Sequence, residues 1–79
     1  LCIRKNEYDK AVLFAKEALA LDPDSVFAMD VLGLARFKQG RVTEAMRILS
    51  RALKIDPEQS FIRNHYLQVR EYYIQIKKK

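Results

Sequence analysis

Cysteine and histidine are scarce in this 79-residue sequence, which contains one of each. A single cysteine cannot form an internal disulfide, and one cysteine with one histidine cannot supply the ligands of a structural zinc site. We therefore expect no metal ligands and no cofactor. An unpaired thiol favours a reducing compartment, so the expected location is cytoplasmic.

Long apolar runs are also absent. The longest apolar stretches, such as residues 31–35, fall far short of the ~18 residues that a membrane-spanning helix needs. The sequence has no phosphate-binding loop, and His65 has no serine, cysteine or aspartate in helical register to act with it. We expect no membrane span, no catalytic residues, no enzyme activity and no small-molecule substrate.

Glycine and proline occur only twice each, in a sequence that is rich in helix-forming residues. Pro23 and Pro57 each follow an aspartate at the end of an apolar helical pattern, where proline prevents the helix from continuing. Gly40 is suited to the left-handed conformation that ends many helices. The sequence therefore predicts an all-α protein.

The sequence repeats itself at a distance of 34 residues. The coinciding pairs are Ala11 and Ala45, Ala18 and Ala52, Leu19 and Leu53, Asp22 and Asp56, Pro23 and Pro57, and Phe27 and Phe61. A fixed period of this length is typical of repeat proteins. Each repeat is predicted to be a helix, a tight turn and an antiparallel helix, stacked on its neighbours as an α-solenoid.

The repeat predicts three units along the chain. Residues 1–25 would hold the end of a first helix, a turn at Asn6 and a second helix capped by Asp9. Residues 26–59 would form a complete repeat, whose second helix Thr43 would cap. Residues 60–79 are predicted to form one uninterrupted helix that Ser60 caps at its start and that covers, as a capping helix, the apolar face of the preceding pair.

The complete unit carries a spaced set of mostly small and apolar residues. They are Met29, Leu32, Gly33, Arg36, Ala45, Leu49, Ala52 and Pro57. In this spacing the chain resembles the tetratricopeptide repeat family over essentially its whole length, although Met29 stands where the family prefers tryptophan and Arg36 where it prefers tyrosine. Gly33 and Ala45 are expected to let the paired helices approach closely.

The resemblance implies a concave groove, lined by the first helices of successive units, that holds a peptide or helix of a partner protein. By repeat position its lining residues would be Arg4, Phe27, Asp30, Val31, Leu34, Lys38, Phe61, Asn64, His65, Gln68 and Tyr72. Val31 and Leu34 have the alternative of simple packing between helices. Binding of chaperone C-terminal tails is not expected, since the asparagine, lysine and arginine of the family's carboxylate clamp are replaced.

A second surface is basic. The predicted helix over residues 43–55 carries a stripe of cations, and the chain ends in three lysines; these residues are Arg47, Arg51, Lys54, Lys77, Lys78 and Lys79. This face has the charge to bind RNA or an anionic surface, but no aromatic residue is interleaved with the stripe for base stacking. Its simpler interpretation is a solvated helix face.

These features predict a protein–protein interaction module of an adaptor or scaffold, with electrostatic binding to RNA or an anionic surface as the alternative. A helical repeat buries its apolar surface only against its neighbours, and roughly three repeats are usually needed for stability. We therefore expect upstream repeats, or self-association through the open N-terminal end.

Overall fold

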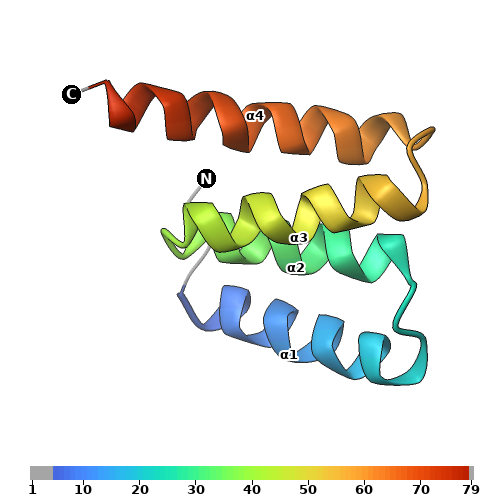
Figure 1. Cartoon of the computed structure of the whole chain (residues 1–79). Helices are drawn as coiled ribbons and strands as arrows, with labels where there is room; N and C mark the ends of the chain where they lie inside the picture. Colours follow the sequence, from blue (N-terminus) through green and yellow to red (C-terminus); the bar gives the residue numbers. More distant parts are fainter. Residues whose placement is uncertain (1–4, 79) are drawn as a thin grey trace.

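The computed structural model describes residues 5–78 (Figure 1). Within this range the chain forms four helices and no strand: α1 (Lys5–Leu21), α2 (Val26–Lys38), α3 (Val42–Ile55) and α4 (Ser60–Lys77). Successive helices run antiparallel, so the predicted all-α class and helical-repeat architecture are confirmed. None of the described helices is long and apolar enough to cross a membrane.

Helix α2 occupies the centre of the fold. It packs against α1 on one side and α3 on the other, and it also contacts α4, which lies mainly on α3. Figure 1 shows α1 and α4 at opposite edges with α2 and α3 between them. Because of this order, residues on different faces of α2 can meet side chains from each of the other helices.

The two Asp-Pro segments form the same kind of loop. Helix α1 ends before Asp22 and helix α3 before Asp56, and the proline that follows each aspartate lies outside the helices. The Asp22 Oδ1 accepts a hydrogen bond from the amide of Asp24 at 3.2 Å, and the Asp56 Oδ1 accepts one from the amide of Glu58 at 3.4 Å. Two loops with the same side-chain hydrogen bond therefore occur 34 residues apart, in agreement with the period of the sequence.

Gly40 ends α2 in the way that the sequence predicts. Its φ of +86° is the only positive φ among the described residues. The amide of Gly40 donates to the Phe37 carbonyl at 3.0 Å, and the amide of Arg41 donates to the Arg36 carbonyl at 2.9 Å. These bonds satisfy carbonyls that the end of the helix leaves without partners.

The predicted turn at Asn6 is wrong. Asn6 and Asp9 both lie within α1, so Asp9 does not cap a helix. Instead, the Asp9 Oδ1 accepts a hydrogen bond at 2.8 Å from Nε2 of Gln39, at the end of α2. Asparagine lacks the conformational freedom of the glycine at the equivalent position 40, so the helix continues through it.

The predicted caps of α3 and α4 are also wrong. Helix α3 begins at Val42, with Arg41 as its N-cap, and α4 begins at Ser60, with Gln59 as its N-cap; neither cap residue makes a side-chain capping bond. Thr43 is exposed in the first turn of α3, because the neighbouring Val42 is buried in the core. Burial of an apolar residue therefore outweighed the capping preference at this position.

The core lies between α2, α3 and α4. Its largest fully buried side chains are Leu49 on α3 and Ile62 and Val69 on α4. A Cβ atom on Gly33 would lie 2.8 Å from the Cγ and 2.9 Å from the Cδ2 of Leu49. Such distances are too short for carbon atoms, so the close approach of α2 to α3 requires glycine at this position.

Helix α4 covers one edge of the core. It continues through Ile74, which occupies the repeat position of Gly40. Leu67 occupies the position of Gly33, and its side chain is 48% exposed because no described helix packs on it. The glycine of the repeat is thus present where a helix packs closely and absent where none does.

Arg36 links three helices. Its Nε lies 3.3 Å from Oε2 of Glu44 on α3, and its Nη1 donates to Oε1 of Gln39 at 3.1 Å. The amide of the Gln39 side chain in turn reaches Asp9 on α1. Arg36 therefore contributes an ion pair and a hydrogen bond to a network that joins α1, α2 and α3.

Candidate functional site

Helices α2 and α4 bring two predicted groove residues together as an aromatic pair. The ring centroids of Phe27 on α2 and Phe61 on α4 lie 6.3 Å apart with their planes tilted by 57°. Phe27 is 67% exposed, whereas Phe61 is half-buried against the core. We call these two residues the aromatic platform. It offers solvent an apolar surface that crosses from one helix to the next.

A partly buried polar contact between side chains lies next to the platform. The side chain of Asp30 is only 9% exposed, and its Oδ1 lies 2.8 Å from Nδ1 of His65 on α4. His65 also stands edge-on to Phe61, with ring centroids 6.4 Å apart. A buried carboxylate is costly unless it is hydrogen-bonded, so this contact fixes α4 against α2 and holds Phe61 beside Phe27.

The other end of α2 forms a second aromatic contact with α4. The rings of Phe37 and Tyr72 lie 5.3 Å apart in an edge-to-face arrangement, which is favourable for aromatic pairs. Tyr72 remains 49% exposed. The Lys38 Nζ stands 5.7 Å from the centre of the Phe37 ring. This end of the surface therefore combines exposed aromatic carbon with a positive charge.

The remaining apolar groove positions face α1 rather than α4. A shallow apolar hollow of about 300 Å³ lies between α1 and α2, and its lining residues are Tyr8, Ala11, Val31, Leu34, Ala35 and Lys38. Val31 and Leu34 are only half-buried there, so packing between helices leaves part of each side chain open. The groove predicted from the sequence thus has an α2–α4 part and an α1–α2 part.

The polar groove residues are placed differently from one another. Asn64 and Gln68 are exposed on α4, whereas Asp30 is buried beneath the surface rather than open to a partner. Arg4 lies outside the described residues. The assignment of these residues to partner binding therefore stays a prediction.

The alternative basic face is divided between two helices. Arg47, Arg51 and Lys54 are exposed on α3, and Lys77 and Lys78 are exposed at the end of α4; Lys79 lies outside the described residues. Because α3 and α4 are antiparallel, Lys54 lies at one end of this pair of helices and Lys77 and Lys78 at the other (Figure 1).

Sequence reasoning missed two features of the site. It did not identify Tyr8 and Ala11, because their equivalents in the complete repeat belong to the second helix, outside the predicted lining. It also did not pair Asp30 with His65, which are 35 residues apart. The 34-residue period could have indicated this contact. A shift of 34 residues from Asp30 leads to the position directly before His65, so the two residues occupy neighbouring places in successive units.

The surface has the composition of a binding site for apolar groups. Exposed aromatic side chains cluster on it, with Lys38 at one end and amides on α4. Among residues 5–78 no cluster of three or more His, Cys, Asp or Glu side chains has the geometry to hold a metal ion.

Comparison with known proteins gives a family. The family model of the tetratricopeptide repeat matches residues 3–64, from the start of the chain into the first turns of α4. A comparison with curated proteins gives no significant match. Tetratricopeptide repeats generally mediate protein–protein interactions.

Proposed function

Since the chain belongs to the tetratricopeptide repeat family, we propose that it is the protein-interaction module of a cytoplasmic adaptor or scaffold and binds a partner segment on its α2–α4 surface. The partner would be a peptide or helix that presents apolar side chains. Its chain would lie across the aromatic platform and toward Tyr72 and Lys38.

The aromatic platform is the observation that carries this proposal. Aromatic side chains, phenylalanine among them, are enriched at protein–protein interfaces, and each buries a large apolar area. Phe27 is 67% exposed although its ring lies beside Phe61. The other described residues therefore cover only part of the Phe27 side chain, and a partner would cover the exposed part.

The Asp30–His65 contact gives the platform a fixed geometry. It joins the two helices that carry the phenylalanines, with the Asp30 carboxyl group buried and the His65 ring partly exposed. A platform that does not reorganise on binding loses less conformational entropy, which favours affinity. Polar selection would come from the exposed residues at the margin, Lys38, Asn64 and Gln68.

The proposal is tested by affinity capture from a cytosolic extract with three forms of the chain. The first is unchanged, the second carries Phe27→Ala, and the third carries Phe14→Ala. Phe14 lies on α1 outside the α2–α4 surface and is 67% exposed, as Phe27 is. The two variants therefore remove the same side chain at the same exposure, and circular dichroism should give equal helicity for both.

We expect partners that the unchanged chain and the Phe14→Ala variant both retain and that the Phe27→Ala variant loses. Retention of the same partners by Phe27→Ala would refute the α2–α4 surface. Partners that both variants retain but that moderate salt releases would instead favour the basic face, because binding to RNA or an anionic surface weakens strongly with salt. Loss of partners only with Phe14→Ala would point to association through α1.

A further inference from the structure

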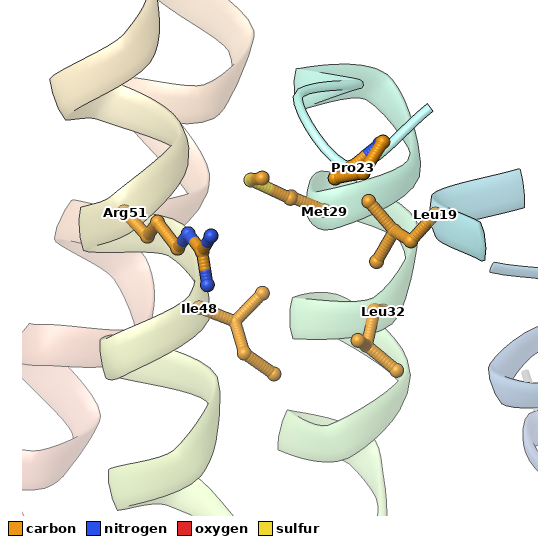
Figure 2. Close-up of a pocket in the computed structure, with 6 residues that line it drawn as sticks. All are labelled: Leu19, Pro23, Met29, Leu32, Ile48 and Arg51. Atoms are coloured by element: carbon orange, nitrogen blue, oxygen red, sulfur yellow. The ribbon is translucent and has the colours of Figure 1, made fainter. Parts of the chain in front are cut away.

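A second hollow lies on the side of α2 that faces away from the aromatic platform. Its volume is about 230 Å³, and it is lined by Leu19, Pro23, Met29, Leu32, Ile48 and Arg51 (Figure 2). Phe27 and Met29 are two positions apart on α2 and so point to nearly opposite sides of a helix with 3.6 residues per turn. We call this feature the Arg51 hollow. It is separate from the groove.

Apolar side chains from three helices form the walls of the Arg51 hollow. Leu19 comes from α1 and Leu32 from α2, whereas Ile48 faces them from α3 (Figure 2). Pro23, in the loop between α1 and α2, closes one end. These elements are held by the packing of α1 and α3 on α2, so the hollow is part of the folded structure rather than a gap between mobile segments.

Arg51 supplies the one charged group of the lining. Its side chain extends from α3 toward α2 (Figure 2), and within the described range it has no carboxylate at ion-pair distance. Asp22 and Asp24 flank Pro23, but neither pairs with Arg51. Arg47 and Lys54, one turn before and one turn after Arg51, are exposed on the same helix.

We propose that the Arg51 hollow binds an acidic protein segment that inserts one large aliphatic side chain and places a carboxylate against the Arg51 guanidinium. The guanidinium group of an arginine can bind a carboxylate by two parallel hydrogen bonds, so an arginine at the edge of an apolar hollow suits a ligand with a carboxylate beside an apolar group. Arg47 and Lys54 would favour further acidic residues on either side of the inserted one.

The size and lining of the hollow limit its occupant. Engineered apolar cavities of about 150 Å³ accept a molecule as small as benzene, whereas pockets for drug-sized ligands begin at about 300 Å³. A hollow of about 230 Å³ fits one leucine or methionine side chain. RNA is a poor match, because none of the six lining residues is aromatic and a base would have no surface on which to stack.

The experiment is an NMR titration of the 79-residue chain, labelled at its backbone amides and at the methyl groups of isoleucine, leucine and methionine. The probe is an N-acetylated, C-amidated pentapeptide with leucine at its centre and two glutamates on each side. Two control peptides replace the leucine with alanine or the four glutamates with glutamine. The affinity is read from the chemical-shift changes of the Leu19, Leu32 and Ile48 methyl groups.

Arg51→Gln and Arg47→Gln form a matched pair of variants. Both remove one positive charge from an exposed position of α3, but only Arg51 lines the hollow. We expect Arg51→Gln to weaken binding of the probe about tenfold, and Arg47→Gln to weaken it no more than about twofold. Both control peptides should bind more weakly than the probe.

Three results would overturn the proposal. Equal weakening by the two variants would mean that the peptide responds only to the general positive charge of α3. Shift changes confined to residues of the aromatic platform would place the peptide in the groove. Equal affinity of the leucine and alanine peptides would show that no side chain enters the hollow. Each of these leaves the proposed function of the groove unaffected, since Phe27 lies on the other face of α2.

Discussion

Replacing Gly33 with alanine should destabilise the protein, although alanine is the better helix former. The substitution adds one methyl group whose carbon would lie 2.8 Å from Leu49 Cγ. Leu49 is fully buried and Cγ is its branch point, so the side chain cannot simply turn aside. Overpacking of this kind lowers the free energy of unfolding by about 1–3 kcal/mol, whereas the higher helix propensity of alanine raises it by up to about 1 kcal/mol. We expect a net loss of about 1–2 kcal/mol.

Thermal and urea unfolding followed by circular dichroism would measure this loss. A domain of this size should lose about 5–15 °C in its melting temperature for that change in free energy. The Leu49→Ala substitution provides the control, because it removes Cγ and Cδ2, the two atoms that the new methyl group would meet most closely. Its cost should be smaller in the Gly33→Ala background than in the unchanged chain, by at least about 0.5 kcal/mol. Stabilisation by Gly33→Ala alone would refute the steric reasoning.

Two further substitutions test the other structural contacts. His65→Ala should leave the buried carboxylate of Asp30 without its partner and lower the free energy of unfolding, measured with urea, by about 1–3 kcal/mol. The double variant with Asp30→Ala should recover part of that loss. If the costs of the two substitutions simply add, the two side chains do not interact as the structure shows. Gly40→Ala should cost about 1–2 kcal/mol, because its φ of +86° is strained for residues with a side chain and no packing compensates; an unchanged melting temperature would contradict this.

The sequence predicted the architecture because its strongest signals are backbone signals. Proline cannot continue a helix, and the two Asp-Pro segments fix where α1 and α3 end. Gly40 fixes the end of α2 in the same direct way. Proline and glycine affect the backbone at their own positions, so their effect can be predicted without knowing which distant residues pack against them.

The helix starts and the site contacts were harder to predict because they depend on partners far away in the sequence. Thr43 is a good capping residue, but the burial of Val42 determines where α3 begins. Asp9 has the side chain of a cap, yet it bonds to Gln39 across the fold. Local preference and distant packing compete at these positions, and distant packing prevails in each of them.

Helix α2 connects the stability of the fold to both proposed binding surfaces. Gly33 packs on α3, Asp30 bonds to α4, and Arg36 joins a network that reaches α1 and α3. A helix held on three sides presents its outward residues in fixed positions, which favours binding without reorganisation. The same contacts explain why a change at a buried residue of α2 would disturb the groove and the Arg51 hollow together. Exposed residues such as Phe27 and Arg51 are therefore the positions at which recognition can be separated from folding.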